Sequence, residues 1–228
     1  MYSKVSDKLN RFKNGLRQYG PEYLIYCITS RLPGWFLGYH HTYLLTAREL
    51  NLNISAEDGL DVRFASHDDI MRSKITAVDR QKSSQRFRNG SKCAVVYSRG
   101  KMVSIGWAAV GRIFTRQAGS VIDTKNDGVY VYDVYSLPEE RGKGFYRACL
   151  KLISDFYSLH QRSRKYVIID VLNSDSINAH IRLGFRVCGE SIHVVLGGIN
   201  ICFYKKWPQK KSRFHIFLKK PPGNSREV

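Results

Sequence analysis

The chain has 228 residues, 43% of them hydrophobic and 12% aromatic, which is enough apolar material for one well-packed domain with an appended segment. A formal net charge of +18 favours an anionic partner, such as nucleic acid, anionic lipid, an acidic glycan or a phosphorylated cofactor. No stretch approaches the roughly 20 apolar residues of a membrane-spanning helix, and no secretory signal is evident.

The N-terminal part, residues 1–59, is predicted to be a basic, aromatic extension. Residues 4–19 have apolar side chains at helical spacing among lysines and arginines, and residues 22–46 are rich in aromatics and broken by Pro33-Gly34. Two interpretations stay open. The segment packs on the main domain, or residues 1–46 lie on an anionic membrane surface.

The next part, residues 60–207, is predicted to be one domain. Residues 60–64 alternate like a strand, and Ser66 with Asp69 resembles a helix N-cap, followed by a polar, basic helical stretch to about Phe87. Residues 93–98 and 102–110 predict a β-hairpin around the turn at 99–101.

A strand, helix, strand, helix series follows. The predicted elements are a strand at 129–137, a helix at 145–159, an apolar strand at 166–172, a helix at 174–183, and strands at 185–188 and 192–204. This order predicts an α+β fold, layered α/β/α, with a mixed sheet covered by helices.

The C-terminal part is basic, and residues 208–228 are predicted to be a tail. Lysines and arginines alternate with aromatics over residues 205–220. One interpretation is a strip that binds phosphate or lipid headgroups, and the other is an edge strand protected by lysines.

Cysteine and histidine spacing argues against metal. The five cysteines form no Cys-x-x-Cys pair and most lie beside apolar residues, so we expect buried, reduced thiols. The seven histidines show no ligand spacing, and we predict no metal site.

The segment 138–144 joins a predicted strand directly to a predicted helix. Its glycines let backbone N–H groups turn towards a pyrophosphate, the helix dipole favours negative charge, and Arg141 and Lys143 add positive charge. The spacing is neither that of the P-loop nor that of the dinucleotide fingerprint.

This loop resembles the acyl-CoA loop of the GNAT superfamily of N-acyltransferases, whose pattern is Arg/Gln-x-x-Gly-x-Gly/Ala. Arg141 and Gly144 match its first two fixed positions, whereas the third is Tyr146, a bulky departure. Residues 173–185 resemble the second motif of the family, in which an Asn follows a strand and the next helix closes in Gly-Phe. The likeness covers roughly residues 60–205.

The resemblance implies a mixed, mostly antiparallel twisted sheet flanked by helices, with a helical N-terminal extension in this chain. It implies that acetyl-CoA or another acyl-CoA is the donor, bound through a strand that splays from its neighbour. A backbone N–H of that strand would polarise the thioester carbonyl. The positions implied to contact the cofactor are Tyr135, Ser136, Leu137, Arg141, Gly142, Lys143, Gly144, Phe145, Tyr146, Asn173 and Ser176.

Two residues are candidates for proton transfer. His180 occupies the position where the family commonly has a Tyr, so it is a candidate general acid for the leaving thiolate. The alternative is a partly buried His that hydrogen-bonds the loop. Asp133 is expected to face the same way as Val131 and Tyr135, where it would orient or deprotonate the amine. The alternative is a strand Asp paired with a basic neighbour.

The predicted function is an acyl-CoA-dependent N-acyltransferase, in the first place an N-acetyltransferase, acting on a primary amine. We consider an amino sugar or a cell-surface polysaccharide or lipid intermediate as acceptor, and a cytoplasmic location at the inner face of the membrane. Alternatives are a longer-chain acyl or aminoacyl transferase, with residues 22–46 lining an acyl tunnel, and a non-catalytic CoA-binding protein. Nucleic-acid binding would rest on charge alone. The sequence does not set the oligomeric state.

Overall fold

The computed structural model describes residues 12–29, 31, 37–52, 60–73, 75, 78–115 and 117–206, together with the backbone at 212–218 and 226–227. Residues 12–19 are helical, and residues 4–11 of the predicted basic helix lie outside the described part. The labelled elements are, in chain order, α2 (Pro21–Thr29), β1 (Leu37–Ala47), β2 (Leu60–Phe64), α3 (His67–Met71), α4 (Arg80–Arg88), β3 (Lys92–Ser98), β4 (Lys101–Ala109), β5 (Arg112–Thr115), β6 (Ser120–Asp123), β7 (Gly128–Ser136), η1 (Pro138–Glu140), α5 (Phe145–Leu159), β8 (Arg164–Asp170), α6 (Ser174–Arg182), β9 (Arg186–Leu196), β10 (Ile199–Lys206), β11 (Ser212–Leu218) and β12 (Arg226–Glu227).

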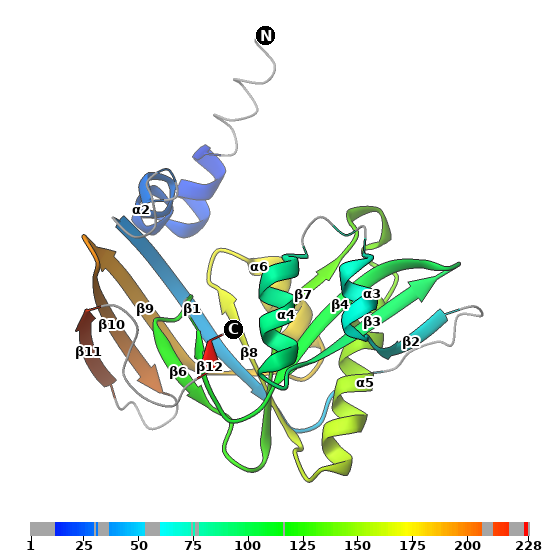
Figure 1. Ribbon diagram of the computed structural model, residues 1–228. Coiled ribbons are helices and arrows are strands. Elements are labelled where there is room, and N and C mark those ends of the chain that lie inside the picture. Colours follow the sequence, from blue (N-terminus) through cyan, green and yellow to red (C-terminus); the bar gives the residue numbers. More distant parts are fainter. Residues whose placement is uncertain are drawn as a thin grey trace.

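One large sheet organises the described chain (Figure 1). It has the order β11-β10-β9-β1-β8-β7-β4-β3-β2, and a smaller sheet has the order β12-β5-β6. In the large sheet all neighbours are antiparallel except β7 and β8, which are parallel. This confirms the predicted fold class, α+β with a mixed, mostly antiparallel sheet.

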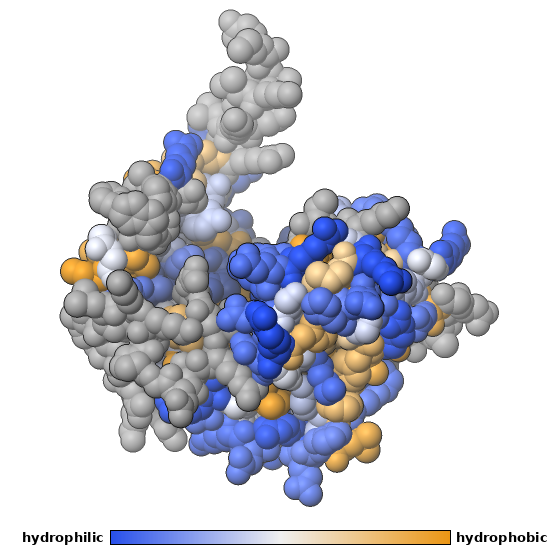
Figure 2. Space-filling view, viewed as in Figure 1, coloured by the Kyte–Doolittle hydropathy of each residue, from blue (hydrophilic) through white to orange (hydrophobic). Residues whose placement is uncertain are grey.

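Helices cover both faces of this sheet. On one face, α5 buries Leu150 and Ile153 against Val131 of β7 and Ile169 of β8. On the other face, Trp107 of β4 and the strand tyrosines form a second core beneath α3 and α4. The helix α4 is polar, and Figure 2 shows hydrophilic side chains over the surface around it.

Several predicted elements are confirmed. The hairpin of β3 and β4 and the helix α5 occur where they were expected, and Ser66 caps α3 through a capping box with Asp69. The helical stretch expected from Ser66 to Phe87 is instead two helices, α3 and α4. The C-terminal edge strand is present as β11.

The N-terminal extension differs most from the expectation. Its residues 37–47 form β1, which pairs with β8 on one side and with β9 on the other. Thr42, for example, lies between Asp170 and Ser191. The predicted division at residue 60 therefore does not coincide with a break in the sheet, because backbone hydrogen bonds of β1 complete the ladder between β8 and β9.

The cysteines are all free thiols, with Cys93, Cys149 and Cys202 buried and the other two half-buried. Burial raises the pKa of the Cys149 thiol to about 12. Among the described residues, no helix is long and apolar enough to cross a membrane.

Candidate functional site

The parallel strands β7 and β8 separate soon after they begin. They pair only between residues 128–130 and residues 164–166. Beyond that point, the described part of β7 pairs with β4 and that of β8 pairs with β1. An opening in the sheet therefore lies between the carboxyl-terminal halves of the two strands. This confirms the splay of the strands that the resemblance implied.

A β-bulge interrupts β7 at this opening. Asp133 and Val134 together oppose Gly106 of β4, and Asp133 has a positive φ of 43°. The extra residue shifts the alternation of side chains. As a result, Val131 packs in the α5 core, whereas Tyr135 packs in the core on the other face. The expectation that Asp133, Val131 and Tyr135 share one face was wrong, because it assumed an unbroken strand.

Asp133 points to the face covered by α4. Its carboxylate forms an ion pair with Arg86 of α4, and the Asp133 side chain is 61% exposed. The Arg86 guanidinium is buried, and it lies 5.2 Å from the ring centre of Trp107 and 5.1 Å from that of Tyr132. The basic neighbour considered as an alternative for Asp133 is thus present, on the face opposite α5.

The loop after β7 has the features of an anion site. Gly142 and Gly144 have positive φ values of 81° and 84°, a conformation that glycine adopts without strain. Gly144 is the N-cap of α5 and provides no side-chain cap, so N–H groups of the first turn remain available to an anion. Arg141 is exposed beside them, and Lys143 pairs with Glu140 at 2.7 Å.

The strand end before the loop is partly engaged in the sheet. The Leu137 N–H donates to the Val103 carbonyl at 3.0 Å, and the Tyr135 carbonyl accepts from the Ser104 hydroxyl at 3.1 Å. These two groups, which the resemblance assigned to the pantetheine arm, are already hydrogen-bonded. The Ser136 hydroxyl also meets that of Ser104, at 2.8 Å.

Asn173 serves as a helix cap. Its side-chain oxygen accepts from the backbone N–H of Ser176 at 3.1 Å, at the start of α6. The cap was one of the two roles considered for this residue. The side-chain amide nitrogen of Asn173 is the group left for a ligand, and the residue is exposed.

The structure joins two predicted site residues that the sequence treated separately. The Tyr146 hydroxyl, from the first turn of α5, lies 2.5 Å from Nε2 of His180 on α6. The Nδ1 of His180 lies 2.7 Å from the Ser176 carbonyl, which can only accept, so Nδ1 carries the proton and Nε2 accepts from Tyr146. We call this contact the Tyr146–His180 bridge.

The bridge bears on the predicted general acid. His180 is buried, and burial lowers the pKa of its imidazole, which favours the neutral ring. The one N–H of that neutral ring, at Nδ1, donates to the Ser176 carbonyl. The geometry is closer to the alternative interpretation, a partly buried His that hydrogen-bonds the loop, although its partners are Tyr146 in the first turn after the loop and Ser176. It does not support His180 as a proton donor.

Sequence reasoning missed Arg86 and the proximity of Tyr146 to His180. Arg86 is one of several basic residues on a polar helix, and no local signal distinguishes it from the others. Among the described residues, no cluster of three or more His, Cys, Asp or Glu side chains could hold a metal ion.

Comparisons with known proteins find only distant likeness. No family model matches the chain, and no curated protein is similar to it. Among solved structures, a putative GNAT-family acetyltransferase from Novosphingobium aromaticivorans is 16% identical, covering 66% of this chain and 60% of its own, with a TM-score of 0.47. A GNAT-family acetyltransferase from Colwellia psychrerythraea is 12% identical, covering 68% and 55%, with a TM-score of 0.46. A putative acetyltransferase from Salmonella typhimurium, solved with acetyl-CoA, is 21% identical, covering 57% and 80%, with a TM-score of 0.42.

This chain thus spans less than two thirds of the length of the first two proteins. At these identities and TM-scores the likeness carries no argument about activity. The geometry of the chain itself gives the conclusion: it has the layered α+β fold, with a strand diverging from its parallel neighbour, that the resemblance to the GNAT superfamily implies.

Proposed function

We propose that this protein is an acyl-CoA-dependent N-acyltransferase. The observation that carries the proposal is the opening between β7 and β8, which has the glycine-containing loop and the uncapped start of α5 at its mouth. A long, flexible donor with a pyrophosphate in its middle fits such a site, because the pyrophosphate finds N–H donors and its arm reaches the separated strands.

In this proposal the loop 141–144 and the first turn of α5 hold the pyrophosphate. Arg141 adds a guanidinium, which pairs well with phosphate oxygens. Gly142, Lys143 and Phe145 contribute backbone N–H groups, and the amide of Asn173 faces the arm beside Ser176. Tyr146 lies along the path of the arm, where the resemblance would place a small residue.

The acceptor amine would approach from the α4 face. Asp133 would hold it there and take its proton directly or through water, with Arg86 orienting the carboxylate. The amine nitrogen forms a bond to the thioester carbonyl carbon, the carbon–sulfur bond breaks, and the thiolate takes a proton from solvent. For the acceptor we keep the class of primary amines, with an amino sugar or a cell-surface polysaccharide or lipid intermediate as candidates.

The donor site is tested by calorimetric titration of CoA into wild type and Arg141→Ala. Loss of a charge-assisted contact is expected to weaken CoA binding roughly 10-fold to 100-fold. The matched control is Lys151→Ala, which removes an exposed cation from the middle of α5 and is expected to change nothing. No CoA binding by wild type, or equal loss in both variants, would contradict the donor site.

Turnover is tested by free-thiol release from acetyl-CoA and longer acyl-CoAs with a panel of amines. Asp133→Asn is expected to lower turnover by roughly 100-fold, within the range for a general base, with CoA affinity unchanged. Asp61→Asn, which alters an exposed ion pair with Arg63, is the control.

A second candidate function is that of a protein that binds CoA without turnover. The observation that favours it is the Tyr146–His180 bridge, which joins the two helices beside the opening. Tight CoA binding with no thiol release from any amine would support this function over catalysis.

A further inference from the structure

One end of the molecule exposes an unusual concentration of apolar side chains. Of the nine large hydrophobic residues that the structure describes as exposed, seven belong to α2 or to the hairpin of β9 and β10. Ile28 is 52% exposed and Leu196 45%. We define the apolar end by six of these residues: Leu24, Ile25, Ile28, Leu196, Ile199 and Phe203.

The two parts of the apolar end are neighbours. The helix α2 packs on β1, and Leu37 at the start of β1 pairs with Leu196 of β9. Leu196 in turn pairs with Ile199 across the hairpin turn. Figure 2 shows hydrophobic residues on the side of the molecule where Figure 1 places α2 and the adjoining ends of β9 and β10. The helix α2, the start of β1 and the hairpin tip are therefore neighbouring parts of one end of the molecule.

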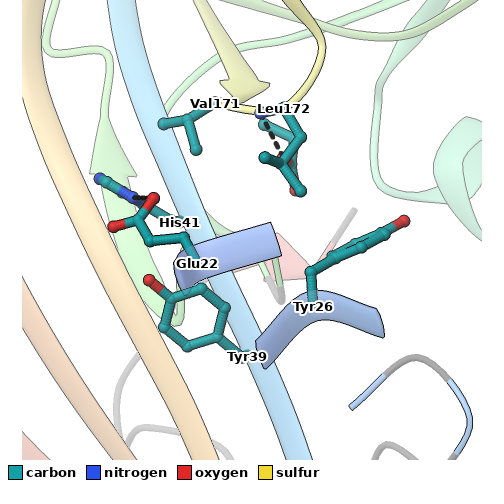
Figure 3. Close-up of a pocket in the computed structure, with 7 residues that line it drawn as sticks. Glu22, Tyr26, Tyr39, His41, Val171 and Leu172 are labelled. Atoms are coloured by element: carbon teal, nitrogen blue, oxygen red, sulfur yellow. Dashed lines mark hydrogen bonds and ion pairs between the residues drawn. The ribbon is translucent and has the colours of Figure 1, made fainter. Parts of the chain in front are cut away.

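Glu22 of α2 is turned towards His41 of β1 (Figure 3). Nδ1 of His41 lies 3.1 Å from a Glu22 carboxylate oxygen, and Nε2 lies 2.7 Å from Glu190 of β9. We call this contact the His41 clasp. Glu22, Tyr26 and His41 line the same small pocket, so the side of α2 that carries Glu22 and Tyr26 faces the sheet. Leu24, Ile25 and Ile28 lie on other positions of the helix and are exposed.

The charged residues around the apolar end indicate which kind of partner it binds. Lys13 and Arg17 on the preceding helical turns are exposed, and Arg31 is exposed just after α2. Glu22 and Glu190, the acidic groups nearby, are engaged by His41. A second copy of the chain would bring these cations against each other, whereas anionic headgroups would complement them.

We propose that the apolar end docks on an anionic membrane surface, with Leu196 and the α2 side chains inserted among the lipids and the cations above them at the headgroups. This proposal does not depend on acyltransferase activity. Exposed apolar residues rimmed by cations are the combination by which interfacial segments bind membranes.

The test is flotation of the full chain with phosphatidylcholine vesicles, with and without phosphatidylserine, at low and high salt. Wild type is expected to float with the anionic vesicles, and less so at high salt. Replacing Lys13 and Arg17 by Gln is expected to weaken binding about fivefold per residue, roughly 25-fold together. Leu196→Asn and Ile28→Asn are each expected to weaken it about tenfold.

Leu159→Asn is the matched control, since Leu159 is 84% exposed at the far end of α5. It is expected to bind as wild type does. The proposal is overturned if wild type does not float, or if Leu159→Asn binds as weakly as Leu196→Asn. A concentration-dependent dimer in sedimentation without vesicles, weakened by Leu196→Asn, would overturn it in favour of a second copy.

Discussion

At the scale of single residues, the Tyr146–His180 bridge changes the chemistry that the sequence indicated. A neutral imidazole has one proton, and the 2.7 Å contact to the Ser176 carbonyl fixes it on Nδ1. The ring can therefore only accept at Nε2, and the hydroxyl that reaches it comes from Tyr146, the position where the loop departs from the family pattern. Both departures from that pattern, at Tyr146 and at His180, are thus accounted for by one hydrogen bond.

This bond predicts a stability effect. Tyr146→Phe removes the hydroxyl and leaves the buried Nε2 of His180 without a donor, which is expected to lower the free energy of unfolding by about 1 to 3 kcal/mol. Urea unfolding followed by fluorescence measures this difference. Tyr26→Phe, at a tyrosine that is 41% exposed, is the control and is expected to change stability by less than about 0.5 kcal/mol. Equal midpoints for Tyr146→Phe and wild type would show that the bridge contributes nothing.

At the scale of elements, the sequence predicted those whose signals are local. The helix α5 carries one apolar stripe, and its bounds were predicted as the structure has them. The strand β8 was recognisable because it is apolar on both faces, and the loop between β7 and α5 because glycines lie between a strand and a helix pattern. The same elements surround the candidate donor site.

The elements that depend on distant partners could not be predicted. β1 contains two adjacent histidines, and its strand neighbours β8 and β9 lie more than 100 residues away in the chain. Only the pairing makes this segment a strand of the sheet. The bulge at Asp133 is equally non-local, because it is defined against Gly106 of β4. An unbroken alternation was the simplest expectation, and it grouped Asp133 with Val131, which packs on the other face of the sheet.

The attachment of α2 to the sheet gives a prediction at this scale. Because both ring nitrogens of His41 face carboxylates, Glu22→Gln replaces one acceptor of the clasp with a neutral amide and should loosen α2. We expect the amides of α2 to exchange with deuterium about 5-fold to 30-fold faster, corresponding to roughly 1 to 2 kcal/mol.

Asp155→Asn, which changes the exposed pair with Lys151 on α5, is the control and should leave the exchange of α2 unchanged. If α2 exchanges equally fast in wild type and Glu22→Gln, the clasp does not hold the helix.

At the scale of the whole molecule, the buried His180 and the half-buried His40 couple folding to pH. Burial lowers the pKa of His180, and burial together with the neighbouring His193 lowers that of His40, against an opposing effect of Asp170. Both rings are therefore neutral in the folded protein at pH values where the unfolded chain binds protons.

The sign of the effect follows from this difference in bound protons. Between the lowered folded-state pKa values and the ordinary value of about 6.5, the unfolded state holds more protons, so stability rises with pH. Each histidine contributes at most about 1.4 kcal/mol per pH unit within that window and nothing above it.

Urea midpoints of His180→Gln measured from pH 5 to 8 should therefore vary less steeply than those of wild type, whatever the change in absolute stability. Equal slopes for His180→Gln and wild type would mean that His180 titrates alike in the folded and unfolded chain, and the neutral, accepting imidazole of the Tyr146–His180 bridge would have to be abandoned.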